Sequence, residues 1–426
     1  MDGNRIYKGY WWLPSAPDNQ VAGTLNVEED GDLHLELYGC FGQEGNRFDF
    51  ERESDKVIYG RCYAPNGHMK DISLFECHSA IRMNFSSSFP ITLYSCQYAL
   101  IGFHTLSMKE HVFYEAHVSF DELAYWCPPK IIMTCYNESA LTITFDYSDD
   151  NAILDEIEME NGLILRLKQG GSFQPDYPKV FIEQSTYLDI LKEELSGLDI
   201  LEISRMFGSF LSLAMLYPVE HGIVTLFSRD CFQTTESGRR YYHPIELVTH
   251  LYKSMSKKKI VQPDLLFKHE DVEDAFPQMY KRFCTDKSIA LIWSNLIDSL
   301  EKKRVFTSND FLVVVQALDG FSIRYRKEGK FLSQLTSLRE EFNDIKKLKL
   351  TSDDLMVARG SRDYYTHILK LENKEKKNAL DGVQLLNLTK KLRVLLICCM
   401  LKFLGMDTAK INSLLNRCNN AILDAR

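Results

Sequence analysis

Hydrophobic and polar positions follow two different patterns along this 426-residue chain. In the first part, apolar and polar residues alternate over short runs, as in "GTLNVEEDGDLHLELYG", where Asp30-Gly31 separates two such runs. Alternation turns one face of a strand toward a core, and Asp-Gly between two strands is typical of a hairpin turn. A second hairpin is expected around Asn66-Gly67. This part of the chain is therefore predicted to be β-rich.

Further short runs in the same part also read as strands, namely "FYEAHVSF", "LTITFDY", "LILRLK" and "KVFIEQ". Short strands at this spacing predict an antiparallel sandwich or barrel. The aromatic residues Tyr10, Trp11 and Trp12 are interpreted as packing residues rather than as a ligand surface. Six acidic residues between Asp149 and Glu160 are more typical of a solvated connector than of a metal site, whose ligands converge from separate elements.

From His243 onward the apolar residues recur at helical spacing, in "HPIELVTHLYKSM", "DKSIALIWSNLIDSLEKK", "SNDFLVVVQALDGFSIRY" and "GKFLSQLTSLREEFNDIKKL". Thr351 followed by Asp354 is a capping signal that starts another helix. "LENKEKKNALDG" is interpreted as a lysine-rich loop, and "VQLLNLTKKLRVLLICCMLKFLG" as the central helix. Short connections between these helices predict a helical bundle.

The fold class expected is therefore α+β and multidomain. We predict a β-rich region over residues 1–240, with a possible sub-boundary near 150, and a helical domain over residues 241–426. The polar stretch "SRDCFQTTESGRRYYHP" marks the boundary between them.

Charge divides the chain at the same place. Residues 1–240 carry 18 Lys and Arg against 36 Asp and Glu, a net charge of −18, whereas residues 241–426 carry 32 against 23, a net charge of +9. The helical part alone is therefore expected to attract a polyanion such as RNA. The alternative is that the opposite charges help the two parts dock on each other.

The cysteines and the apolar runs indicate a compartment. Eleven scattered cysteines without a Cys-x-x-Cys pair argue against a disulfide framework and a zinc ribbon, and favour a reducing environment. The start of the chain lacks the pattern of a secretion signal, and the longest apolar run is far shorter than the roughly 20 residues of a spanning helix. We expect a soluble, cytoplasmic protein with no membrane partner.

The stretch "ARGSRDYYTHIL", residues 358–369, places Arg362 and His367 on a predicted helix. Five helical positions advance by about 140° and about 7.5 Å, so a long arginine and a short histidine can reach one groove beside the helix. Arg359 and Thr366 lie near Arg362, three residues before it and four after it. Asp363 follows Arg362 directly and is a candidate for orienting a neighbouring side chain.

This spacing alone is weak evidence, because Arg61 and His68 are similarly spaced. That pair spans the predicted Asn66-Gly67 turn, which does not hold two side chains on one rigid face. The sequence also lacks a Gly-x-x-x-x-Gly-Lys phosphate loop, a His-Glu-x-x-His motif and a Gly-x-Ser-x-Gly motif.

An arginine, a polar residue, three more residues and a histidine before a final apolar helix resemble the motif of the HEPN ribonucleases. Arg362, Asp363 and His367 match that motif position by position. The opening "GYWWLP…GTL…DGDLHLELYG" and the tract "FLVVVQALDGF" resemble the ApeA type of bacterial anti-phage proteins. The resemblance covers nearly the whole chain.

The resemblance implies an RNA endonuclease that acts without metal or cofactor. In such enzymes the ribose 2′-OH attacks the adjacent phosphorus, leaving a cyclic phosphate and a 5′-OH. His367 is then the general acid/base, since its ordinary pKa of ~6.5 suits proton exchange, and Arg362 stabilises the charge on the phosphoryl oxygens. Because each chain has one such motif, the resemblance also implies a homodimer through residues 330–426 with a composite site.

The resemblance further implies an abortive-infection toxin whose β-rich region senses a phage-encoded protein and whose helical domain cuts host RNA, with tRNA as one candidate. Weaker candidates for RNA binding are Tyr365, whose ring would stack on a base, together with Arg359, Thr366 and the three lysines Lys374, Lys376 and Lys377. The alternative hypothesis is a non-catalytic dimer that binds RNA or a nucleotide, with a ligand- or protein-binding β-domain.

Overall fold

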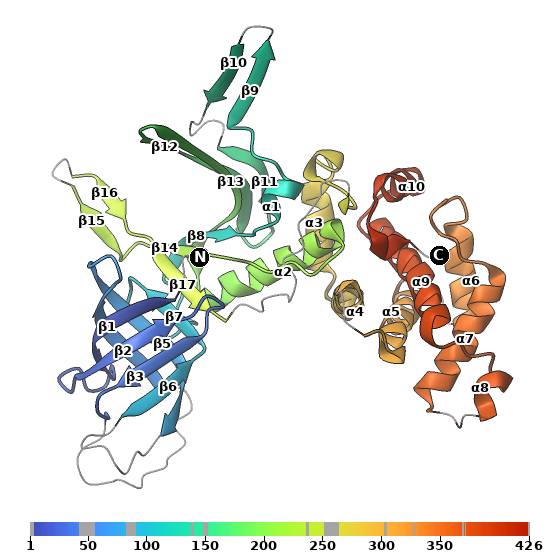
Figure 1. The fold of residues 1–426 in the computed structure, drawn as a ribbon, viewed down its shortest axis with the longest axis horizontal. Coiled ribbons are helices and arrows are strands. Elements are labelled where there is room, and N and C mark those ends of the chain that lie inside the picture. Colours follow the sequence, from blue (N-terminus) through green and yellow to red (C-terminus); the bar gives the residue numbers. More distant parts are fainter. Residues whose placement is uncertain are drawn as a thin grey trace. The chain divides into compact units, whose positions relative to one another are not determined.

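The computed structural model describes residues 4–41, 56–81, 91–137, 140–146, 148, 152–235, 238–250, 264–301, 305–326, 329–368, 370 and 372–424. The chain forms two compact units, each assembled from separate stretches of sequence (Figure 1). The first unit consists of residues 1–121, 129–205 and 220–257, and the second of residues 122–128, 206–219 and 258–426. The domain boundary at residue 240 stays a prediction, and Arg240 itself lies in a strand of the first unit.

The first unit is built from antiparallel strands, which confirms the β-rich expectation. Thirteen of its described strands form one sheet in the order β11-β12-β13-β8-β14-β17-β7-β5-β4-β1-β2-β3-β6, and β9-β10 and β15-β16 form two separate pairs. The strands are β1 (Arg5–Trp12), β2 (Val21–Val27), β3 (Leu33–Leu37), β4 (Lys56–Tyr63), β5 (Met69–Ile81), β6 (Thr92–Cys96), β7 (Tyr98–Ile101), β8 (Phe113–Ser119), β9 (Ile132–Asn137), β10 (Ala140–Phe145), β11 (Ile153–Glu158), β12 (Ile164–Asp176), β13 (Lys179–Leu195), β14 (Val224–Ser228), β15 (Phe232–Thr234), β16 (Arg240–Tyr242) and β17 (Ile245–Thr249).

Six of these strands close into a barrel, because β6 pairs with β5 as well as with β3. The two predicted hairpins are confirmed: β2 pairs with β3, and β4 with β5. Alternate residues of these strands turn inward, and Trp11 lies fully buried in the barrel core. The Trp11 ring packs against Gly60 of β4. A Cβ at this position would lie 2.4 Å from the indole ring, so a residue with a side chain would not fit there. The predicted packing role therefore holds for Trp11, while Tyr10 is exposed.

Two segments differ from the sequence-based expectation, and the stretch expected to mark the domain boundary contains strands. "HPIELVTHLYKSM" was predicted to be helical, but Ile245–Thr249 is strand β17, and residues 251–255 lie outside the described part. The expected acidic connector contains strand β11, in which Glu156 pairs with Arg166 of β12. The expected boundary stretch forms the β15-β16 hairpin. In each case an antiparallel partner strand satisfies the backbone, which short sequence patterns do not reveal.

The second unit is helical, as expected, and α2 runs from the first unit into it. Its helices are α1 (Leu123–Trp126), the end of α2 (Gly197–Met215), α3 (Phe276–Thr285), α4 (Ala290–Leu300), α5 (Ser308–Tyr325), α6 (Phe331–Glu341), α7 (Ser352–Thr366), α8 (Glu372–Lys376), α9 (Gly382–Phe403) and α10 (Thr408–Arg417).

Helix α9 is the central helix of this unit, in agreement with its apolar sequence. Its residues 392–401 are all buried, and it contacts α4, α5, α6 and α10.

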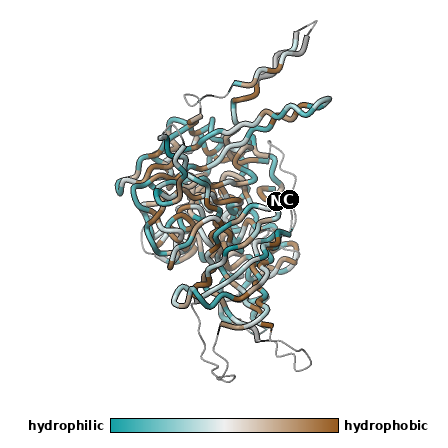
Figure 2. The backbone as a smooth tube through the Cα atoms, turned by 90° about the vertical axis from the view of Figure 1, so that its left-hand side faces the viewer, coloured by the Kyte–Doolittle hydropathy of each residue, from teal (hydrophilic) through white to brown (hydrophobic). Residues whose placement is uncertain are grey.

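Hydrophobic and hydrophilic residues alternate at short range along the chain (Figure 2). In the described part of the chain, no helix combines the length and the apolar character needed to cross a membrane.

Candidate functional site at helix α7

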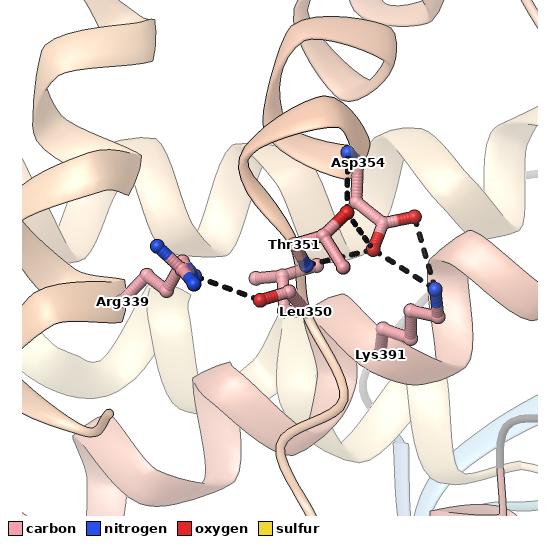
Figure 3. A network of polar contacts seen from close by, with 5 residues as sticks. All are labelled: Arg339, Leu350, Thr351, Asp354 and Lys391. Carbon is pink, nitrogen blue, oxygen red and sulfur yellow. Dashed lines mark hydrogen bonds and ion pairs between the residues drawn. The ribbon is translucent and has the colours of Figure 1, made fainter. Parts of the chain in front are cut away.

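A network of polar contacts fixes the start of α7 (Figure 3). The Thr351 N–H donates to Asp354 Oδ2 over 2.8 Å, and the Asp354 N–H donates to Thr351 Oγ1 over 3.2 Å. This is the predicted capping box. Lys391 of α9 donates to both Asp354 oxygens over 3.0 and 2.9 Å, and Arg339 of α6 donates to the Leu350 carbonyl over 2.7 Å. The helix therefore begins at a point held by two neighbouring helices.

The same network shifts the pKa of Asp354. Burial favours the neutral carboxyl, but the hydrogen bonds from Thr351 and Lys391 together outweigh burial, so the pKa lies below its ordinary value. Asp354 is therefore ionised at neutral pH, and its charge also lies in the first turn of the helix, where a negative charge is favourable.

The opposite end of α7 packs closely on α8 and the segment that follows it. A Cβ at Gly360 would lie 1.8 Å from the Lys377 carbonyl oxygen, so the two backbones touch at this glycine. The Leu380 N–H donates to Ser361 Oγ over 3.0 Å, and the Tyr365 hydroxyl donates to the Leu380 carbonyl over 2.7 Å. The stretch predicted to be a lysine-rich loop thus contains a short helix that is fixed against α7.

Arg362 lies within α7, and two residues from other helices hold its guanidinium. Its Nη2 donates to Asp319 Oδ2 of α5 over 3.1 Å, and its Cζ lies 4.6 Å from the ring centroid of Phe331 of α6. The arginine side chain remains 34% exposed. An ion pair and a cation–π contact together restrict the rotamers of a long side chain. Arg362 is therefore held in place and still accessible.

Sequence reasoning missed both Asp319 and Phe331. Asp319 lies within "FLVVVQALDGF", where an acidic residue interrupts a largely apolar helix, and that interruption was the available signal. It does not identify the partner, because Asp319 and Arg362 are 43 residues apart in sequence.

His367 directly follows the last helical residue. Helix α7 ends at Thr366, and His367 is its C-cap residue, with φ −96° and ψ 2°. The predicted placement of both residues inside one helix therefore holds for Arg362 but not for His367. The imidazole is exposed, and no described residue forms a hydrogen bond or an ion pair with it. An exposed imidazole can exchange protons with solvent or with a ligand.

The remaining predicted residues lie around these two. Asp363 forms an ion pair with Lys377 over 3.4 Å, so its described partner is neither Arg362 nor His367. Lys374 pairs with Asp381. Tyr365 is half-buried and bonded to the backbone. The exposed members of the predicted set are Arg359, Thr366, Lys376 and Lys377.

The sequence comparisons define the class of protein first. Residues 312–410, which contain α7 with Arg362 and His367, match the Apea-like HEPN family, and residues 6–283 match the family described as ApeA N-terminal domain 1. The chain is therefore a protein of the class that joins an antiparallel β-rich N-terminal region to a C-terminal helical HEPN domain.

The chain belongs to the ApeA family of HEPN anti-phage proteins. HEPN domains of this kind are generally ribonucleases. Comparisons with curated proteins and with solved structures found no match.

Proposed function

We propose that this protein is a metal-independent RNA endonuclease of anti-phage defence, acting by abortive infection. In the proposed reaction, the ribose 2′-oxygen bonds to phosphorus and the bond from phosphorus to the 5′-oxygen breaks. The products carry a 2′,3′-cyclic phosphate and a 5′-hydroxyl. One proton leaves the 2′-hydroxyl, and another reaches the departing 5′-oxygen.

The observation that carries this proposal is that the C-terminal part of α7 and its C-cap, in the HEPN region, carry a guanidinium held in place and an exposed imidazole five residues apart. Arginine has five N–H donors, and the contact to Asp319 uses one of the Arg362 nitrogens. Donors on the other nitrogens remain for two phosphoryl oxygens, which a planar guanidinium matches well. His367 would take up or release the proton, a contribution worth about 10²–10⁴ in rate.

A dimer completes the proposed site. The reaction needs one group that accepts a proton and one that donates a proton, and the motif of each chain offers one imidazole and one guanidinium. We therefore propose that two copies meet through residues 330–426, so that both motifs face one RNA strand. Analytical ultracentrifugation combined with an activity assay tests this step, and an active monomer would contradict it.

The catalytic claim is tested with the full chain in cells challenged with phage, where any trigger is present. We expect His367→Ala and Arg362→Ala to remove protection. The matched controls are Arg61→Ala and His68→Ala, because this second pair has similar spacing but lies on the β4-β5 hairpin. Equal protection by the wild type and by His367→Ala would exclude His367 as a catalytic residue.

The chemistry is tested by the ends of the RNA. RNA from challenged cells, and tRNA incubated with purified protein in EDTA, should acquire 2′,3′-cyclic phosphate ends that depend on Arg362 and His367. Protection that survives both alanine variants, together with RNA binding but no new ends, would favour the non-catalytic binding dimer. Cleavage abolished by EDTA would contradict the metal-independent reaction.

A further inference from the structure

Three potential metal ligands converge in the first unit, outside the HEPN region. Glu115 and His117 lie two residues apart on β8, and therefore on one face of the sheet. Asp189 of β13 lies directly opposite His117 in the strand pairing. His117 Nε2 is 2.9 Å from Glu115 Oε1 and 3.6 Å from Asp189 Oδ1. One donor atom from each residue lies within 4.8 Å of the other two.

Asp189 is the unusual member of this group. Its side chain is fully buried, yet neither carboxylate oxygen accepts a hydrogen bond from any described residue. The nearest cations are Lys168 Nζ, 3.4 Å from Oδ2, and the His117 ring. A buried carboxylate without hydrogen bonds costs free energy, and Lys168 and His117, at 3.4 and 3.6 Å, compensate for this less well than an ion bonded directly to the carboxylate would.

We propose that Glu115, His117 and Asp189 bind a divalent transition-metal ion, with Zn²⁺ as the fitting probe. Bonds of ~2.0–2.2 Å place neighbouring ligand atoms of a four-coordinate ion roughly 3.3 Å apart. The distances of 2.9 and 3.6 Å from His117 Nε2 lie on either side of that value. One imidazole nitrogen and two carboxylates form a donor set that zinc accepts, with water in the fourth position.

The surroundings of His117 fix the ligand geometry. Tyr187 lies on β13 and Phe227 on β14, the two strands that pair with β8. The centroid of each ring is 4.9 Å from that of the His117 imidazole. They restrict rotation of the ring and keep Nε2 directed at the two carboxylates. Metal binding at Nε2 displaces the proton from that nitrogen, which moves to Nδ1 or to solvent. The ion would join β8 to β13 and stabilise this part of the large sheet.

Lys168 is the resident cation with which the metal must compete. Its side chain is 21% exposed, so its ammonium can turn toward solvent when an ion enters. This gives the proposal a distinctive consequence: removing the lysine charge should tighten metal binding. If Asp189 and Lys168 formed only an ion pair without a metal site, Asp189→Asn and His117→Gln would bind Zn²⁺ as the wild type does. The sequence by itself predicts no metal site, and the site proposed here is independent of the proposed RNA cleavage.

The test uses the full chain, freed of metal by chelation and titrated with Zn²⁺ against a competing chromophoric chelator under reducing conditions. We expect Asp189→Asn and His117→Gln to bind Zn²⁺ ~100-fold or more weakly at one site, since losing a ligand exceeds the roughly 10–100-fold effect of losing an outer partner. Lys168→Met should bind it more tightly. Mg²⁺ should not compete, because it prefers six oxygen ligands.

The matched control is Glu28→Gln, in a second acidic group formed by Glu28, Asp30 and Asp32 on the β2-β3 hairpin, where none of the three is buried. It should leave the Zn²⁺ titration unchanged. Comparing variants also separates this site from zinc binding by cysteines. Equal titrations of the wild type, Asp189→Asn and His117→Gln would overturn the proposal, as would an unchanged or weaker affinity in Lys168→Met. Circular dichroism verifies folding, and His117→Gln gives the answer if Asp189→Asn does not fold.

Discussion

Replacing Gly360 by alanine tests the close contact that joins α7 to α8. The new Cβ would lie 1.8 Å from the Lys377 carbonyl oxygen, whereas real Cβ atoms essentially never come within 3.0 Å of such an atom. The oxygen belongs to the backbone and cannot rotate away, so one of the two segments must move by more than 1 Å, as the difference between 1.8 and 3.0 Å shows. Overpacking of this kind costs ~1–3 kcal/mol.

Alanine also favours the helix over glycine by about 1 kcal/mol. Two backbone segments in contact can move apart only slightly, so we expect an overpacking cost in the upper half of the range of ~1–3 kcal/mol. We therefore expect Gly360→Ala to destabilise the helical unit by about 1–2 kcal/mol net. Urea unfolding followed by helical circular dichroism measures the change as a lower transition midpoint.

Gly320→Ala on α5 is the matched control. A Cβ there would lie 2.9 Å from Arg324 Nη1, the end of a flexible side chain, and 3.5 Å from Ile292. The arginine can move aside, so the gain in helix propensity should leave this variant as stable as the wild type or up to ~1 kcal/mol more stable. If Gly360→Ala unfolds at the same urea concentration as Gly320→Ala, the α7-α8 contact is not as close as the structure indicates, and the reasoning is refuted.

Three further substitutions test single contacts of the helical unit. Asp319→Asn should lower RNA cleavage while changing the free energy of unfolding by no more than ~1 kcal/mol, because its ion pair with Arg362 is partly exposed; a fully active variant would argue against positioning by Asp319. Asp354→Asn should cost ~1–2 kcal/mol at pH 7. Since the folded pKa of Asp354 is lowered, its stabilisation is present above the unfolded pKa of ~3.9 and is lost as the pH falls through the folded pKa. The difference between variant and wild type should therefore vanish in acid, and a constant difference in melting experiments would contradict this. Burial lowers the pKa of Arg393 to about 10, although the charge of Asp310 opposes that shift; Arg393→Met should destabilise the helical unit by ~3–5 kcal/mol in urea unfolding, because it leaves the buried Asp310 carboxylate without this cation, and a variant as stable as the wild type would show that the buried charge is not required.

The elements that the sequence predicted well are those that local patterns determine. The β2-β3 and β4-β5 hairpins follow from alternation around an Asp-Gly or Asn-Gly turn, which a few neighbouring residues specify. Helix α7 follows from a capping box whose two members are three residues apart. Such signals need no knowledge of the rest of the chain.

The elements that the sequence predicted wrongly are short runs whose structure depends on a distant partner strand. The segment Ile245–Thr249 carries a pattern that both a helix and a strand accept, and its pairing with β14 and β7 makes it a strand. The acidic run that contains β11 was interpreted as a connector, because pairing with β12 leaves no local signal. For both segments, hydrogen bonds to other strands decided the outcome.

The sequence by itself determined the two-part organisation, the Arg362 and His367 motif and the family resemblance, because each rests on residues that are close together or on long consistent patterns. The tertiary structure alone decided that Asp319 and Phe331 hold Arg362, that His367 lies just beyond the end of α7, and that Asp189 is buried beside His117. The physical reason is that ion pairing and burial depend on distance in space. Chain folding brings together residues whose separation in sequence carries no information about that distance.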